Sequence, residues 1–432
     1  MSPDGDYLTE TVPQGVALPW WRVALMMSAF SVSLPTLVTG VDLARVTTMP
    51  GFVTGMLAGG LILTIIGSLM GIVGARTRLS SYMLARLVFG ERGAMALNAA
   101  FAVSLLGWFG VNIDLFADAM RVLLATLWGW HGPVWPVELG SGLLMTLTTT
   151  VGLCAIDRLS LVLTPLLFLA TVWLLLCALD VPHAGIMDHM PHGHALRMGD
   201  VISAVVGGVA VGAVIMPDLC RFLHRDRDVV LVSVCAYLLS ASFVMFAGGV
   251  AGLLVPQGGM LQIMLHMGLG LLAFGLVFGG TWTVNALNLY SVILSAATVF
   301  PARSHQTSRP VLTLACGLLG TVLAFGGLLD HFIAFLFYLS IAFVPVAGIV
   351  TVDFFVLHAL DHDSMVHAAR RPVVWRAFVS WAAGTGISLL ASAGVVTLTG
   401  IAACDAILGA GMTHALAGFV GRRVAGRAVR RP

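Results

Sequence analysis

The sequence predicts an all-α polytopic membrane protein with twelve transmembrane helices, two inverted five-helix repeats and discontinuous first and sixth helices. Hydrophobic residues make up 59% of the 432 residues and charged residues only 10%, with a mean hydropathy of +0.98. A soluble domain of this size needs more polar surface than that. Apolar runs of about 20 residues, the length that spans a bilayer, fill nearly the whole chain and leave no room for a soluble catalytic domain. A proline interrupts both the first and the sixth run.

The distribution of arginine fixes the number of spans and their orientation. All 22 basic residues are arginines. Basic residues concentrate in cytoplasmic loops, and 19 of the 22 fall on one side if the chain crosses twelve times with both ends inside. Only Arg45, Arg121 and Arg197 fall on the other side. The predicted spans are centred near residues 33, 64, 106, 147, 168, 210, 240, 275, 319, 345, 385 and 409.

These spans divide the chain into seven predicted segments. Two groups of five spans form the repeats, and two further spans follow as accessory helices that serve packing or oligomerisation. The segments are a cytoplasmic N-terminal tail (1–22), the first repeat (23–180), an outer histidine-rich loop (181–198), the second repeat (199–360), a cytoplasmic loop (361–373), the accessory helices (374–420) and a basic cytoplasmic tail (421–432).

The first interruption lies in Ser28–Gly40, where serines and threonines surround Pro35. Proline lacks an amide hydrogen and clashes with the carbonyl four residues earlier, here that of Ser31. In hydrocarbon, a freed carbonyl persists only where another group satisfies it or where it lines a polar cavity. A proline kink patched by serine hydroxyls is one interpretation, and half of a transport site is the other.

The second interruption lies five spans later. Gly207, Gly208 and Gly212 weaken the sixth helix, and Pro217 frees the carbonyl of Ala213. Matched breaks in corresponding helices are the sequence signature of inverted repeats with a binding site near the bilayer midplane. Amino ends of half-helices would face an anionic or hydrogen-bond-accepting ligand, and freed carbonyls would hold a cation. The pair of breaks therefore favours a secondary transporter.

The third span carries Trp108 and Asn112 one helical turn apart, with Leu105 beside them. Tryptophan in a membrane helix can be simple packing, but an amide in lipid is costly and indicates an inward-facing surface. An indole beside an amide suits a flat heterocycle, which stacks on one and bonds to the other. Asp114 and Asp118 follow towards the outer end, as a proton relay or as solvated groups paired with Arg121.

The eighth span has a polar face formed by Thr281, Asn285 and Asn288. Amides on such a face can join neighbouring helices. Alternatively, Asn285 contacts a ligand and Thr283 offers an oxygen to an ion. Both interpretations stay open at this point.

The outer loop contains His183, His189, His192 and His194. Their spacing matches no defined metal site, and the six cysteines lack the CxxC pattern, so we expect no bound metal and no cofactor. No motif for a membrane enzyme is present, and we expect no nucleic-acid partner. The expected partners are a small heterocycle, a cation and the lipid bilayer; the oligomeric state stays open.

Several stretches resemble the nucleobase–cation symporter family, and its bacterial cytosine permeases in particular. They occur in the order found in the family and span nearly the whole chain. The stretches are GARTRLSSYMLARLVFG (Gly74–Gly90), GWFGV (Gly107–Val111), DLCRF (Asp218–Phe222), WTVNALNLY (Trp282–Tyr290) and FVPVAGIVTVDFF (Phe343–Phe355).

The resemblance implies the leucine-transporter fold and uptake of a nucleobase, hydantoin, allantoin or thiamine precursor coupled to Na+, or alternatively to H+. It implies that Trp108 stacks on the ligand ring and that Asn112 and Asn285 bond to the ligand. The remaining implied substrate-site positions are Leu105, Gly208, Val209 and Ser33. The implied ion-site positions are Ala29, Val32, Ser33, Gly280 and Thr283.

The chain also departs from the family pattern at specific positions. Cytosine permeases have a glutamine where this chain has Leu105, an aromatic residue at Val209 and a serine at Gly208. In the eighth span the paired threonines read Thr283–Val284, and an upstream asparagine reads Gly280. A lost hydrogen-bond partner for a polar ring costs about 1–3 kcal/mol, which argues against cytosine itself.

We therefore expect a symporter that imports a nucleobase such as cytosine or a purine, or a related nitrogen heterocycle, by alternating access. An amino-acid or amine transporter on the same fold is the alternative, and an enzyme is not expected. The expected location is a bacterial-type inner membrane.

Overall fold

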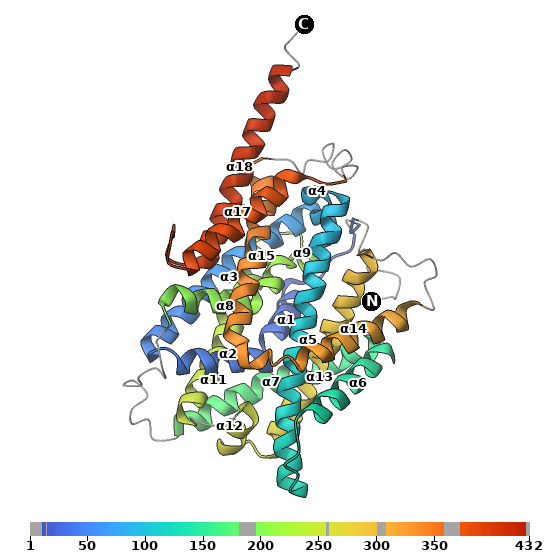
Figure 1. Cartoon of the computed structure of the whole chain (residues 1–432), viewed down its shortest axis with the longest axis vertical. Coiled ribbons are helices and arrows are strands. Elements are labelled where there is room, and N and C mark those ends of the chain that lie inside the picture. Colours follow the sequence, from blue (N-terminus) through green and yellow to red (C-terminus); the bar gives the residue numbers. More distant parts are fainter. Residues whose placement is uncertain are drawn as a thin grey trace.

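The computed structural model describes residues 11–13, 15–151, 153–180, 196–255, 259–299, 308–357 and 372–428. All regular secondary structure in these residues is helical (Figure 1). Most of the histidine-rich loop (181–195), most of the predicted cytoplasmic loop (361–371) and parts of both tails (1–10 and 429–432) lie outside the described residues.

The first half of the chain supplies seven helices that correspond to the first five predicted spans. They are α1 (Trp20–Ser31), α2 (Leu34–Arg45), α3 (Met49–Thr77), α4 (Ser81–Phe89), α5 (Glu91–Trp128), α6 (Trp135–Val151) and α7 (Leu153–Asp180). The first span is the broken pair α1 and α2, and α4 is a short connector before the third span.

The second half of the chain follows the same order of helices and again begins with a broken helix, here α8 and α9. Its helices are α8 (Met198–Val214), α9 (Pro217–Cys220), α10 (Asp226–Ser233), the π-helix η1 (Val234–Ala241), α11 (Ser242–Leu254), α12 (Met260–His266), α13 (Leu271–Val299), α14 (Ser308–Ala324), the 3-10 turn η2 (Leu329–His331) and α15 (Phe332–Phe355). The accessory helices are α17 (Trp375–Ser392) and α18 (Ala402–Ala428).

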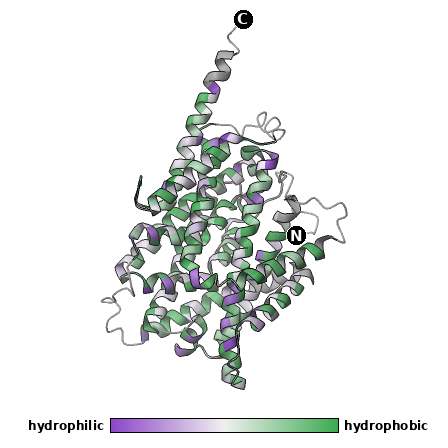
Figure 2. Ribbon diagram, in the orientation of Figure 1, coloured by the Kyte–Doolittle hydropathy of each residue, from purple (hydrophilic) through white to green (hydrophobic). Residues whose placement is uncertain are grey.

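Every predicted span therefore has a helical counterpart, and the all-helical fold class is confirmed. Within the described part of the chain, six helices or broken helices are long and apolar enough to cross a membrane by themselves. Apolar residues also cover the outside of the ribbon, as expected for a lipid-facing surface (Figure 2). The predicted centre of the eighth span, near residue 275, is wrong by about ten residues because the apolar residues of α12 extend the hydrophobic run on its amino side.

The first break is a true unwinding. Helix α1 ends at Ser31, Val32 and Ser33 leave the helical conformation, and Pro35 lies in the first turn of α2. Within α2, the Thr39 hydroxyl donates to the Pro35 carbonyl at 2.8 Å. Ser33 and Thr36 share a hydrogen bond of 3.0 Å between their hydroxyls. At the break itself, the Ser33 amide donates to the Ser31 carbonyl at 3.0 Å. The break is therefore an unwinding over two residues rather than a proline kink alone.

The second break lies at Ile215 and Met216, immediately before Pro217 at the start of α9. Proline is well tolerated in a first helical turn, which explains why the new helix starts there. The three glycines lie within α8, which is continuous up to Val214. Glycine lowers helix propensity by only about 1 kcal/mol, and packing against neighbouring helices overrides it.

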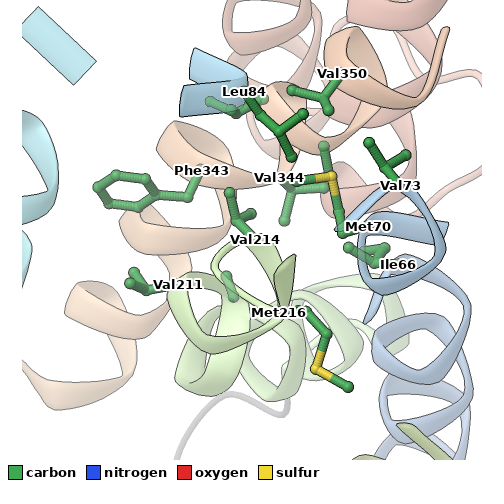
Figure 3. Packing of buried hydrophobic residues seen from close by; sticks show 14 of the residues in the cluster. Ile66, Met70, Val73, Leu84, Val211, Val214, Met216, Phe343, Val344 and Val350 are labelled. Atoms are coloured by element: carbon green, nitrogen blue, oxygen red, sulfur yellow. The ribbon is translucent and has the colours of Figure 1, made fainter. Parts of the chain in front are cut away.

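Two large apolar clusters hold the broken helices in place. One cluster joins α3, α4, α8 and α15, and Figure 3 shows Met70, Val214 and Val344 meeting in its interior. The other joins α2, α11, α12 and the outer half of α5. Each break therefore lies at the edge of a closely packed apolar cluster.

Glycines bring the helices together where backbones meet directly. A Cβ at Gly40 of α2 would overlap the Met245 backbone of α11, and one at Gly207 of α8 would overlap the Leu336 carbonyl of α15. Small residues at such contacts allow helices in lipid to gain dispersion energy in the absence of a hydrophobic driving force.

The accessory helices bind to the end of the second repeat through buried polar groups. The Asp353 carboxylate of α15 accepts from Arg376 of α17 and pairs with His414 of α18, each at 2.9 Å. His414 also contacts the Ser380 hydroxyl at 3.3 Å. The two accessory helices lie side by side along α15 at the edge of the molecule (Figure 1).

Replacing Gly40 by alanine tests the close contact between α2 and α11. We expect a loss of about 1–3 kcal/mol in stability, because the added methyl group overlaps the Met245 backbone. The measurement is the melting temperature of detergent-purified protein. The matched control is Gly386→Ala in α17, where a Cβ would meet nothing within 4 Å. Equal melting temperatures for the two variants would contradict the proposed close contact.

Candidate functional site

Trp108 lies where the two apolar clusters meet. It is half-buried on α5 and packs against members of both clusters. Its ring makes edge contacts with Phe335 and Phe332 of α15, with ring centroids 5.4 and 6.0 Å apart. Edge-to-face pairs of this kind hold aromatic rings in a fixed relative orientation.

Asn112 follows Trp108 on α5 and is fully buried. Its amide nitrogen donates to the Trp108 carbonyl at 2.8 Å, one turn back in the same helix. Its amide oxygen has no hydrogen-bond partner in the protein. A buried acceptor without a partner costs about 1–3 kcal/mol, so Asn112 can accept a hydrogen bond from a ligand at a gain.

Asn285 lies on α13 and is also fully buried. Its amide nitrogen donates at 3.2 Å to the Phe109 carbonyl of α5, and it lies 3.2 Å from the Met145 sulfur of α6. The amide therefore joins α13 to the neighbouring helices, as the interhelical alternative supposes. Its oxygen and the Thr281 hydroxyl one turn away are both buried without a partner.

The sixth span does not present the expected backbone. Gly208 and Val209 are half-buried within α8, and the break lies seven residues beyond Gly208 at Ile215. The backbone at Gly208 is therefore helical and offers no unwound groups, because the position of Pro217 decides where the helix stops. A Cβ at Gly208 would meet only the Leu336 methyl groups, at 3.9 Å.

The residues of the expected ion site come from two helices. Ala29 lies in α1, and Val32 and Ser33 form the break, where both are buried. Gly280 and Thr283 lie in α13, and a Cβ at Gly280 would come within 3.1 Å of Leu167 of α7. The side chains of Ala29 and Thr283 lie outside the described part of the structure. Helix α13 contacts α2 just beyond the break.

Sequence reasoning missed the aromatic contribution of α15. The expected aromatic partner on the sixth span reads Val209, whereas Phe332 and Phe335 of α15 flank Trp108. The spacing of three residues in the stretch FIAFLF could have indicated one aromatic helical face. Leu105, one turn before Trp108, is half-buried.

A cavity of about 330 Å³ lies beside α2, the helix that follows the first break. Its walls include aliphatic residues of α2, α5, α12 and α13. Four charged side chains also line it, namely Asp42, Arg45, Asp118 and Arg121. This cavity could not be predicted from the sequence, because α12 comes from a connecting segment.

Replacing Asn285 by leucine tests its role between helices. We expect a loss of about 1 kcal/mol or more in stability, because the Phe109 carbonyl loses its additional hydrogen bond and α13 its polar contact to α5. The melting temperature in detergent reports the effect. Thr281→Val serves as the matched control, since the Thr281 hydroxyl bonds to nothing in the protein. Comparable destabilisation by both variants would disprove a joining role specific to Asn285.

Known proteins and solved structures resemble this chain over nearly its whole length. The family of permeases for cytosine/purines, uracil, thiamine and allantoin matches residues 18–421. The cytosine permease of Escherichia coli K12 is 26% identical over 96% of this chain and 94% of its own length. The hydantoin permease of Microbacterium maritypicum is 24% identical over 71% of this chain and 68% of its own.

Solved structures show the same fold. The inward-facing conformation of Mhp1 superposes with a TM-score of 0.81 at 16% identity, covering 96% of this chain and 95% of its own. Mhp1, a nucleobase-cation-symport-1 family transporter, in a closed conformation with bromovinylhydantoin bound gives 0.75 at 19% identity, with coverage of 95% and 94%. The fold and the length of the match therefore both agree with the family model. The first and sixth spans of this chain are broken, as the sequence predicted. The chain belongs to the family of cytosine/purine, uracil, thiamine and allantoin permeases, and it is a transporter rather than an enzyme.

Proposed function

We propose that this protein imports a nucleobase or a related nitrogen heterocycle by secondary active transport. The observation that carries the proposal is that Trp108 packs against both apolar clusters and is followed one turn later by the free acceptor of Asn112. The names of the relatives support a heterocyclic substrate, since they include cytosine and hydantoin permeases. The neighbour Mhp1 has bromovinylhydantoin bound.

In this proposal, the substrate ring stacks on Trp108, while Phe332 and Phe335 fix the orientation of the indole through edge-to-face contacts. A ring N–H donates to the Asn112 oxygen, which is otherwise without a partner. Leu105, Val209 and the small Gly208 shape the apolar wall, and Ser33 adds a hydroxyl at the break. Asn285 does not contact the ring directly in this proposal; its hydrogen bond to the Phe109 carbonyl holds α13 against α5.

The substrate preference follows from the absence of a hydrogen-bonding side chain at Leu105. Leu105 offers no hydrogen bond, so a ring that relied on a glutamine there loses about 1–3 kcal/mol, or roughly 5- to 150-fold in affinity. We therefore favour a purine, a hydantoin, an allantoin-like ring or a thiamine-precursor pyrimidine over cytosine. Competition by amino acids in place of bases would instead favour the amino-acid alternative.

Transport is coupled, in this proposal, to the inward movement of a cation, Na+ or H+. The proposed ligands are the carbonyls of Ala29 and Val32 with Ser33 at the break, and Gly280 and Thr283 of α13 are the remaining positions. A cation bound only in the outward-open state shifts the population towards that state and so raises substrate affinity. The Val284 side chain, which has no hydroxyl, weakens the sodium site.

The proposed location is a bacterial-type inner membrane with both termini in the cytoplasm. The excess of arginine in the loops on that side supports this orientation. The two five-helix repeats (23–180 and 199–360) then move against each other around the site, while the accessory helices (374–420) stay packed on α15.

Uptake of radiolabelled bases by a permease-deficient strain tests the proposed function. We expect saturable uptake of at least one purine, pyrimidine, hydantoin or thiamine-precursor pyrimidine.

Replacing Trp108 by alanine tests the stacking role. Trp108→Ala should weaken substrate binding by about 2 kcal/mol, roughly 30-fold, because the stacking surface is lost. Trp375→Ala is the control, since Trp375 is 73% exposed on α17. Absence of uptake across the whole panel would refute the function, and unchanged affinity of the Trp108 variant would refute stacking.

Dissipation of ion gradients tests the coupling. Gramicidin conducts both Na+ and H+, so we expect it to stop accumulation of substrate above the external concentration in proteoliposomes. Counterflow, in which labelled substrate exchanges for unlabelled substrate, should continue because it needs no gradient. Accumulation that survives gramicidin would exclude coupling to either cation.

A further inference from the structure

Asp114 is a buried carboxyl group that the proposed substrate and ion sites do not use. It lies on α5, two residues beyond Asn112, and only 7% of its surface is exposed. Neither carboxylate oxygen has a hydrogen bond of normal length and angle among the described residues. The Leu329 backbone in η2 lies near enough for a weak hydrogen bond to the carboxyl group. Ionisation of a carboxyl group in such a place costs far more than in water unless a cation compensates it.

The charged groups around Asp114 add to this cost. Asp118 of α5, Glu138 of α6 and Asp330 of η2 all interact with it electrostatically. The nearby Arg121 pairs with Asp118 at 3.5 Å and so compensates that carboxylate. Arg45 and Asp42 line the same cavity as Asp118 and Arg121. Of the four carboxyl groups that interact here, Asp114 is the most deeply buried. Binding of a cation at Asp114 removes both the desolvation cost and the repulsion.

The cavity of about 330 Å³ lies close to Asp114 along the chain. Asp118, one helical turn after Asp114, lines the cavity, as do Leu115 and Leu329. Asp114 itself is not part of the lining, so Asp118 is the carboxyl group through which a proton could pass between the cavity and Asp114.

The chemistry of the surroundings favours a proton over a metal ion. Sodium and other hard cations need several oxygen ligands converging on one point. A proton needs only one carboxyl group, and Asp114 supplies one that is buried and has no close hydrogen bond among the described residues.

We propose that Asp114 is the proton-binding group that couples substrate import to the proton gradient. This inference rests on the proposed function. The Asp114 carboxylate takes up one proton from the cavity, and the neutral acid that results is compatible with its apolar surroundings. Release of that proton on the inner side restores the charge, so each transport cycle moves one proton inward.

The link between proton and substrate runs through the start of α15. The Asp114 carboxyl lies next to the Leu329 backbone, three residues before Phe332, whose ring contacts Trp108. A change of charge at Asp114 therefore acts on the same turn that holds the stacking surface in place. Substrate affinity and proton occupancy then depend on each other, as reciprocal coupling requires.

The first test uses wild-type protein in proteoliposomes in sodium-free choline buffer with the pH dye pyranine trapped inside. The probe is radiolabelled cytosine or another base from the uptake panel that supports counterflow. We expect substrate influx to acidify the lumen and an inside-alkaline gradient to raise accumulation at least tenfold. Accumulation that requires sodium, or influx without acidification, overturns the proposal whether or not any variant folds.

The second test replaces the carboxyl group. Asp114→Asn keeps the shape but cannot release a proton, so we expect proton-driven accumulation to fall at least tenfold. Counterflow should continue, because the neutral amide resembles the protonated acid. Asp330→Asn is the matched control, since Asp330 belongs to the same acidic group but is exposed, and its accumulation should remain within twofold of wild type.

The outcomes separate the two proposals. Wild-type counterflow with loss of accumulation only in Asp114→Asn supports proton coupling through Asp114. Wild-type counterflow with full accumulation by Asp114→Asn overturns this inference and leaves the proposed import function intact. Equal losses in Asp114→Asn and Asp330→Asn overturn the specific role of Asp114. Lack of wild-type counterflow with every base refutes both proposals.

Discussion

The structure depends on one constraint, which is that every backbone polar group within hydrocarbon must find a partner inside the protein. A helix meets this requirement by itself, and an unwound segment does not. The break at Val32 and Ser33 is consequently enclosed by buried residues on both sides, and hydroxyls of Thr36 and Thr39 bond close to it. The break before Pro217 lies against the apolar cluster shared with α3 and α15. The neighbouring helices therefore keep the unwound backbone groups at the breaks away from hydrocarbon, which lowers the free-energy cost of the breaks.

The same enclosure determines what the breaks face. Helix α5 passes between the two clusters, and Trp108 lies at their junction. Helix α15 closes the other side with Phe332 and Phe335, and it packs on α8 through the close contact at Gly207. The accessory helices bind α15 through Asp353, whose buried carboxylate contacts Arg376 and His414. Such a pair is costly to break once buried, so α15 is a firmly held wall of the site.

Unpartnered polar atoms mark where this interior is incomplete. The oxygens of Asn112 and Asn285, the Thr281 hydroxyl and the Asp114 carboxylate are all buried without hydrogen bonds. Most buried polar groups in folded proteins form hydrogen bonds. Each of these four groups can therefore still form a hydrogen bond, for example with a ligand. These four groups lie on α5 and α13, which pack against each other along their length. Further buried polar atoms without a partner in the described residues, such as the Ser31 hydroxyl of α1, lie on other helices. A heterocycle and a cation are ligands of the right polarity for these atoms.

The sequence alone determined the class, the number of spans and the existence of both breaks, because hydropathy, arginine placement and proline act locally along the chain. It also singled out Trp108 and Asn112, since a costly amide in lipid indicates function. It could not place the second break, because glycines near Gly208 weaken a helix that packing then stabilises. Only the tertiary structure decided that Asn285 joins α13 to α5, that α15 supplies the aromatic neighbours of Trp108, and that Asp114 is buried without a close hydrogen bond. These features depend on which helices meet, and contacts between distant segments leave no periodic signal in the sequence.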